Sequence, residues 1–136
     1  MTSGYSGTPL AKKLSLKGGM RVWFDGMPES VADDIASEGL QLQLLEGPEA
    51  PIGAAHIFVT ERADLDVKLK QLLPVLHRAG MIWVSWPKKA SKVPTNITED
   101  VVREVALPMH LVDVKVCSVD DIWSGLKLVI RKEHRS

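Results

Sequence analysis

The chain has 136 residues, of which 45% are apolar and 25% charged, the composition of one ordinary globular domain. Seventeen basic and seventeen acidic residues give a net charge of zero, which argues against nucleic acid or an anionic membrane as the partner. The single cysteine, Cys117, excludes an internal disulfide and a metal site built from several cysteines. No signal peptide or run of 18 apolar residues is present, so we expect a cytoplasmic protein.

Charge is distributed unevenly along the chain. Residues 29–66 hold nine acids against Arg62, a sum of −8, and residues 67–103 hold seven bases against two acids, a sum of +5. Such blocks are typical of solvated faces on different helices. A bipolar surface that pairs with itself or steers a charged ligand is the alternative, and the sequence leaves both open.

The first third of the chain alternates between helical and extended patterns. Residues 1–8 are rich in Ser and Gly and predict a flexible arm, after which Thr8 and Pro9 are typical of an N-cap and first helical position. The apolar run at 20–24 predicts a buried strand, and Pro28 opens a helix that ends near Gly39. Leucines alternate with glutamines over 40–44, which predicts a half-buried strand at or near an edge.

The middle of the chain holds the strongest helical pattern. Residues 56–60 (HIFVT) predict a strand, and 81–86 (MIWVSW) predict a strand buried on both faces. Between them leucines recur at helical spacing from Leu65 to Leu76, and Pro74 is expected to kink or divide that helix.

The last third predicts a helix capped by Thr98 and a closing antiparallel hairpin made of runs at 112–117 and 126–130. Strands that alternate with helices predict a single α/β domain over 9–132, a three-layer sandwich with a mostly parallel sheet and a tail at 133–136. The link from Glu46 to Ala54 is too short for a helical crossover. The sheet is therefore either mixed there, or the link crosses one end of it in extended form.

Two segments carry a resemblance to a known fold family. "LKGGMRVWFDG" is similar to the start of the first strand of class I methyltransferases, which are Rossmann-like, and "LPVLHRAGMIWVSWP" is similar to their late helix–strand unit. The resemblance implies S-adenosylmethionine held by a glycine-rich turn after the first strand and an acid ending the second. Here residues 25–29 occupy that turn with a single glycine, and Glu46 lies 20 residues beyond Gly26.

A second resemblance covers nearly the whole chain. The blocks "GYSGTPLAKKL", "WPKKAS", "TEDVVREV", "LVDVKVC" and "WSGLKLV" are similar to those of a small bacterial family, a domain of unknown function. This resemblance implies no reaction.

Candidate ligand-binding residues follow the strands, because open α/β sheets bind ligands beyond the carboxyl ends of their strands. The loop after the strand at 81–86 offers two ammonium groups, an aromatic face and a hydroxyl for a phosphate or a nucleotide. The candidates are Lys88, Lys89, Ser91 and Trp86, with Glu46 for a ribose and Lys12 if the first helix folds over the same crevice. A solvated loop, with the tryptophan packed on the core, is the alternative.

The Trp–Ser–Gly segment near the hairpin offers a second candidate surface. Trp123, Ser124 and Lys127 could contact a partner, and the alternative is a tryptophan folded back on the sheet. No catalytic triad motif, zinc-binding histidine pair or Walker loop is present, so we expect no catalytic residue, metal or cofactor.

Together these observations favour a non-catalytic domain that binds a partner or assembles with itself. The first alternative is a protein or minimal enzyme that binds a small phosphate-containing ligand, nucleotide or adenosyl compound in the strand-end crevice. The second is a nucleic-acid-binding module that uses lysines of the same loop and the first helix, although the net charge argues against it.

Overall fold

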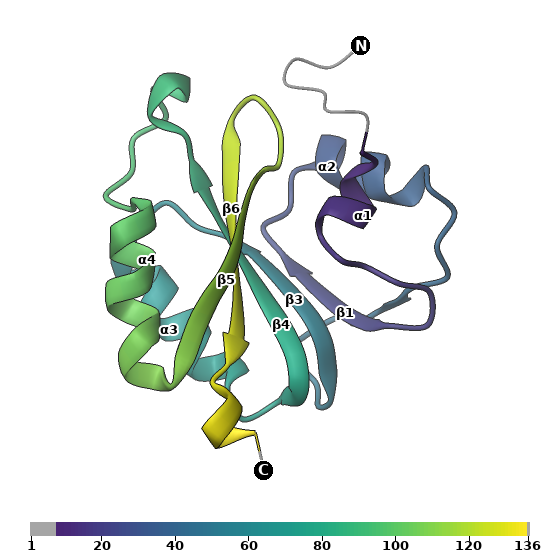
Figure 1. Ribbon diagram of the computed structural model, residues 1–136. Helices are drawn as coiled ribbons and strands as arrows, with labels where there is room; N and C mark the ends of the chain where they lie inside the picture. Colours follow the sequence, from purple (N-terminus) through teal and green to yellow (C-terminus); the bar gives the residue numbers. More distant parts are fainter. Residues whose placement is uncertain (1–7, 136) are drawn as a thin grey trace.

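Six strands form one sheet between two layers of helices in the computed structural model, which describes residues 8–135 (Figure 1). The expected arm at 1–8 lies, apart from Thr8, outside these residues. The strands are β1 (Arg21–Asp25), β2 (Gln43–Leu44), β3 (Ile52–Phe58), β4 (Leu76–Pro87), β5 (Leu111–Ser118) and β6 (Trp123–Ile130). The α-helices are α1 (Leu10–Lys13), α2 (Glu29–Ala36), α3 (Arg62–Leu72) and α4 (Glu99–Ala106), with short 3-10 turns at Lys89–Ser91, Leu107–Met109 and Lys132–His134.

The strand order is β2-β1-β3-β4-β6-β5. Strands β1 to β4 are parallel, and β6 is antiparallel to both of its neighbours, β4 and β5. The expected α/β sandwich with a mostly parallel sheet and a closing hairpin is therefore confirmed. The hairpin is inserted with its second strand inward, so β5 becomes an edge of the sheet.

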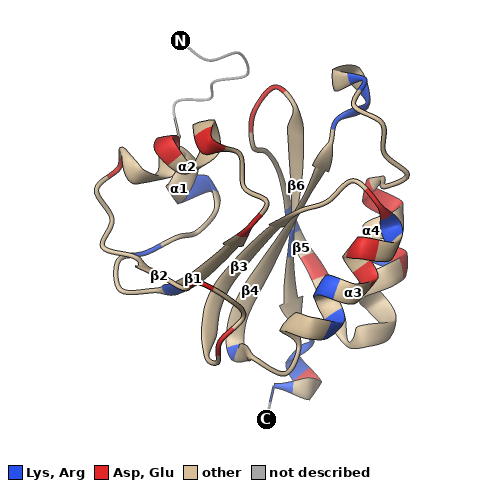
Figure 2. Cartoon of the chain, turned by 180° about the vertical axis from the view of Figure 1, so that it is seen from behind, with Lys and Arg blue, Asp and Glu red and all other residues tan. Residues whose placement is uncertain are grey.

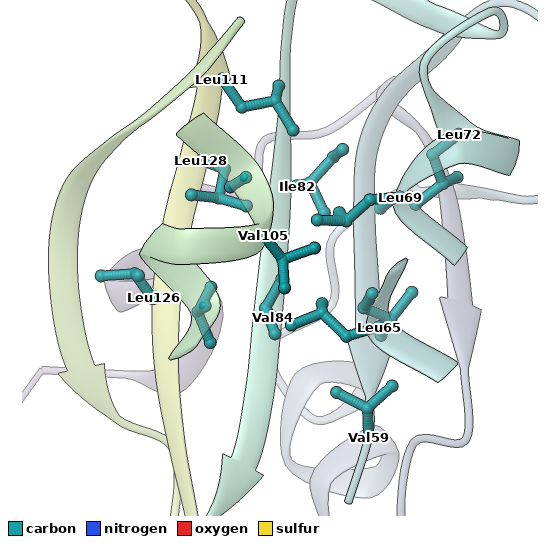
Figure 3. Packing of buried hydrophobic residues seen from close by; sticks show 14 of the residues in the cluster. Val59, Leu65, Leu69, Leu72, Ile82, Val84, Val105, Leu111, Leu126 and Leu128 are labelled. Carbon is teal, nitrogen blue, oxygen red and sulfur yellow. The ribbon is translucent and has the colours of Figure 1, made fainter. Parts of the chain in front are cut away.

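Two hydrophobic clusters cover the two faces of the sheet. On one face α3 and α4 bury Leu65, Leu69 and Val105 against Ile82 and Leu126 (Figure 3). On the other face α1 and α2 bury their apolar residues against alternate residues of the same strands; these are Leu14, Val31 and Ile35 against Val22, Phe58 and Trp83. Because both faces of β3 and β4 are covered, these strands are almost continuously buried, as the apolar sequence predicted for residues 81–86 of β4.

Helix α3 ends earlier than its leucine pattern predicted. It stops at Leu72, two residues before Pro74, and β4 begins at Leu76. Leu73 still has helical geometry, but Pro74 lacks the N–H that would donate the next hydrogen bond of the helix. The expected helix through Leu76 is therefore wrong, and the following strand starts five residues before the predicted Met81.

Local signals at three other places had different outcomes. Thr98 caps α4 as predicted, because its Oγ1 accepts a hydrogen bond from the N–H of Val101 at 3.2 Å. The expected Thr8 cap is wrong, since Pro9 holds the N-cap position of α1 without a side-chain bond. The expected strand over 40–44 shrinks to β2, which is an edge strand with Leu44 68% exposed.

The short link between β2 and β3 crosses the end of the sheet without a helix. Strands β2 and β3 flank β1 on opposite sides and run parallel to it, so the link over 45–51 is the extended crossing and the sheet is not mixed there. The side chain of Arg21 holds this link, donating from Nε to the carbonyl of Pro51 at 2.8 Å.

Candidate functional site

The carboxyl ends of the four parallel strands meet at one edge of the sheet, the upper edge in Figure 1. From β1 the chain passes through α2 to β2 on one side, and β3 then lies on the other side of β1. The helices that follow β1 and β3 pack on opposite faces of the sheet. This reversal is the switch point at which open α/β sheets bind ligands.

The turn between β1 and α2 lies at the switch point. Gly26 has φ +72°, and a Cβ built there would lie 3.2 Å from the carbonyl oxygen of Phe58 at the end of β3. A side chain would therefore be both strained and crowded, which is the physical reason for glycine here. Pro28 precedes the helix, whose first turn has no side-chain cap and keeps its leading backbone N–H groups toward this edge.

Glu46 follows β2, which pairs with the first two residues of β1, Arg21 and Val22. The N–H of Leu45 bonds to the carbonyl of Val22 at 2.8 Å, and β1 continues three residues further, to Asp25, so Glu46 leaves the sheet before the level of the Gly26 turn. Glu46 is exposed, and no ion pair within residues 8–135 includes it. Its carboxylate is available as a hydrogen-bond acceptor.

Asp25, the last residue of β1, is held on the opposite face. Its Oδ2 pairs with Nζ of Lys68 on α3, and both side chains are about three-quarters buried. The pair joins the last residue of β1 to a residue of the basic block at 67–103. Asp25 is therefore engaged in tying α3 to the sheet.

The lysine-rich loop after β4 lies at the same edge but on the other side of the switch point. Strands β1 and β3 stand between β2 and β4, so three strand spacings, about 14 Å, separate the strands that carry Glu46 and Lys88. The structure therefore does not bring Glu46 next to the lysines. It places Lys89 and Lys12 in solvent.

Two of the predicted ligand residues have structural partners instead. Trp86 is 7% exposed and belongs to the cluster under α3 and α4. Ser91 Oγ donates to the carbonyl of Lys88 at 2.7 Å and accepts from the N–H of Val93 at 3.2 Å, which folds the loop on itself.

Lys88 instead meets the β5–β6 hairpin. Its Nζ donates to Oγ of Ser118 at 2.6 Å and its N–H to the carbonyl of Ile122 at 2.7 Å. Lys13, at the end of α1, reaches the carbonyl of Ser118 from the other side at 3.5 Å. The sequence analysis did not include Ser118, because no local pattern shows which loop the hairpin tip would touch.

The second predicted surface is partly folded into the protein. The ring of Trp123 packs edge-on against Phe58, with ring centroids 5.1 Å apart, and Ser124 is half-buried beside it. Nζ of Lys127 donates to Oγ of Ser15 at 3.3 Å. The side chain of Trp123 thus belongs to the cluster under α1 and α2.

A buried histidine–serine pair lies below this edge and was not singled out from the sequence. Nε2 of His56 on β3 lies 2.7 Å from Oγ of Ser85 on β4, and the ring stacks on Phe58. Burial lowers the pKa of His56 to about 3, so the ring is neutral. Nδ1 has no hydrogen-bond partner, and His56 is only 2% exposed, so this pair cannot contact a ligand from solvent.

Two other kinds of site were sought over residues 8–135. No three His, Cys, Asp or Glu side chains gather there as a group that could hold a metal ion. No helix in that part of the chain is long and apolar enough to cross a membrane.

Three solved methyltransferases are similar in structure to this chain. One is a SAM-dependent methyltransferase from Aquifex aeolicus, with TM-score 0.56 and 14% identity, covering 89% of this chain and 88% of that one. Another is magnesium protoporphyrin IX methyltransferase from Synechocystis PCC 6803 with bound SAM, with TM-score 0.57 and 9% identity, covering 89% and 74%. A putative methyltransferase from Thermoplasma acidophilum has TM-score 0.57 and 8% identity, covering 97% and 77%.

No family model and no curated protein matches the chain. The structural likeness, at 14% identity or less in these three, establishes the fold, a methyltransferase-like Rossmann sheet. It overturns the leading expectation of a non-catalytic partner-binding or self-assembling domain. The small-ligand alternative fits these neighbours better, because the fold of this chain is one that holds SAM in a solved structure.

Proposed function

We propose that this chain binds an adenosyl compound at the carboxyl ends of β1 and β2 and acts as a methyltransferase. The observation that carries the proposal is the switch point at β1, where the Gly26 turn and the start of α2 follow β1 and Glu46 follows the adjacent strand β2. The structural likeness to a methyltransferase with bound SAM supports it.

The residues at the switch point fit the nucleoside part of such a ligand. The exposed carboxylate of Glu46 can accept hydrogen bonds from two ribose hydroxyls. The turn packs on β3 through Gly26, and Gly26 itself is exposed. The first N–H groups of α2 have no side-chain cap and can donate to an electronegative group.

S-adenosylmethionine, when bound, supplies a methyl group activated by its sulfonium charge. The chain's own contribution is to bind and orient, because transfer requires the acceptor, the methyl carbon and the sulfur in line. The Asp25–Lys68 ion pair holds the end of β1 against α3 and so fixes the base of the turn. Membership in the small bacterial family and a cytoplasmic location stay predictions from the sequence.

Titration calorimetry with S-adenosylhomocysteine tests the assignment. Glu46→Gln removes the charge of the proposed acceptor, and Glu49→Gln is the matched control, an exposed glutamate in the same link. Hydrogen bonds to a charged group contribute about 1.5–3 kcal/mol, so we expect Glu46→Gln to weaken binding by about ten- to a hundredfold. Glu49→Gln should leave Kd unchanged. Absence of binding to the native chain, or equal affinity of both variants, would overturn the proposal.

A further inference from the structure

Five lysines from distant parts of the sequence gather around the β5–β6 hairpin. We call them the lysine cluster; its members are Lys13, Lys17, Lys88, Lys115 and Lys127. In Figure 2 the end of α1 and the turn beyond β4 are blue, and the hairpin tip between them is red.

Two ammonium groups converge on Ser118, the last residue of β5. Nζ of Lys88 and Nζ of Lys13 approach the hydroxyl and the carbonyl of Ser118, respectively, from β4 and α1. The thiol of Cys117, the residue before Ser118, is half-buried and lies near the same lysines. Burial raises the pKa of this thiol, and the charges of Lys13, Lys115 and Lys88 oppose that rise.

The cluster continues along the β5–β6 ladder. Lys115 and Lys127 are register partners, directly opposite each other on the same face. Nζ of Lys115 donates to the carbonyl of Lys13 at 3.0 Å, and Nζ of Lys127 to the hydroxyl of Ser15. Burial lowers the pKa of Lys127 most, and the charges of Lys115 and Lys17 lower it further. Neutral oxygens, not carboxylates, therefore hold these ammonium groups.

The ammonium groups of the cluster form no ion pair. Within residues 8–135 none of the five lysines lies within 4.0 Å of a carboxylate, although six ion pairs form elsewhere. The nearest acid in the hairpin, Asp120, uses Oδ1 to accept from the N–H groups of Ile122 and Trp123. Like charges directly opposite on a ladder are destabilising, so an anion bound here would relieve repulsion as well as gain contacts.

We propose that the lysine cluster binds a ligand that carries two or more phosphate groups. Ammonium groups act as point charges that suit phosphate, whereas carboxylates are best matched by the fork of arginine, and the cluster contains no arginine. Ser118 and Lys115 are three residues apart on β5, about 10 Å, which is longer than a single phosphate needs. The ligand is a nucleoside polyphosphate or the backbone of a single-stranded nucleic acid, which share this chemistry.

This site differs from the one expected from the sequence. Lys88 is common to both, but its ammonium group contacts Ser118, and Lys13 and Lys115 take the place of Lys89 and Ser91 in the site. The net charge of zero argued against nucleic acid, yet net charge does not report how a fold gathers its cations on one face. The proposal is independent of adenosyl binding at Glu46.

The test compares Lys88→Gln/Lys115→Gln with the matched control Lys70→Gln/Lys132→Gln, which removes the same charge from outside the cluster. The probes are inorganic phosphate and tripolyphosphate, by calorimetry, and a labelled ten-nucleotide oligouridylate, by fluorescence anisotropy at 50 and 200 mM salt. We expect tripolyphosphate, the oligonucleotide or both to bind more tightly than phosphate. The cluster variant should weaken that binding at least about tenfold, and lower the salt slope for the oligonucleotide by about 1.4.

Tighter binding of the oligonucleotide would identify nucleic acid as the source, and binding of tripolyphosphate alone would identify a small polyphosphate. The control should change Kd less than about twofold. Three outcomes would overturn the proposal: no binding, phosphate bound as tightly as tripolyphosphate, or an equal loss in the control. Retained S-adenosylhomocysteine binding by the cluster variant would show that it is folded and that the two proposals stand or fall separately.

Discussion

The imidazole of His56 and the hydroxyl of Ser85 face each other in the interior, 2.7 Å apart on adjacent parallel strands. They lie two register positions apart along the ladder, so each points to the face that α1 and α2 cover. The pair satisfies the serine and one ring nitrogen, and it keeps a titratable group where water cannot solvate its charged form.

The burial of His56 predicts a loss of stability in acid. Its pKa falls from 6.5 to about 3 on folding. Between these two pH values His56 binds a proton in the unfolded chain and is neutral in the folded chain. Stability is therefore lost as pH falls, by about 2 kcal/mol between pH 7 and pH 5 from this group. Urea unfolding at the two pH values measures it. His56→Gln should abolish this part of the loss, and His77→Gln, at an exposed histidine, should retain it.

A second prediction concerns the indole of Trp83, which fastens the segment after α1 to β4. Its Nε1 donates to the carbonyl of Leu14 at 2.9 Å, and the side chain is 1% exposed. Trp83→Phe leaves that carbonyl without its donor and leaves a small void, so unfolding free energy should fall by about 2–4 kcal/mol. Trp23→Phe, at a half-buried position, should cost less. Equal losses in urea unfolding would contradict this role for the bond.

The leucines of α3 should dominate stability on the other face. Leu69 is fully buried between α3 and the sheet, and Leu69→Ala should reduce unfolding free energy by about 2–5 kcal/mol. Leu44, 68% exposed on β2, is the control, and Leu44→Ala should change the unfolding free energy by no more than about 0.5 kcal/mol. A large loss at Leu44 would mean that this edge is covered in solution.

Two glycines with nearly the same backbone conformation allow the cost of backbone strain to be measured separately from the cost of steric crowding. Gly26 and Gly39 have φ +72° and +71°, but only Gly26 has a neighbour, the carbonyl of Phe58, close to an added Cβ. Gly39→Ala should cost about 1–2 kcal/mol, the penalty for alanine in this conformation, and Gly26→Ala should cost more. Gly26→Ala should also lose S-adenosylhomocysteine binding, which Gly39→Ala keeps. The opposite order in thermal unfolding or binding would place the ligand away from the β1–α2 turn.

Short-range sequence patterns determined which helices and strands form. A single residue can still change where such an element ends. The apolar runs of β3 and β4, the leucine spacing of α3 and the cap at Thr98 each act within a few residues, so the sequence predicted them. The same patterns predicted a helix that is too long at Pro74, where the leucine spacing continues to Leu76 although the helix has ended. The strand predicted over 40–44 is also too long, because an edge strand needs a partner and β1 pairs only with Gln43 and Leu44.

The candidate sites depended on tertiary structure to a greater degree. The sequence predicted that Glu46 and Lys88 follow the carboxyl ends of their strands, and both do, but strand order decides that two strands stand between them. The convergence of Lys13, Lys88 and Lys115 needs the hairpin to turn its second strand inward against β4, which places Ser118 beside the loop after β4. Composition and spacing determine where strands and helices form. The order and register of strands are set by long-range pairing, and only that pairing decides which charges meet.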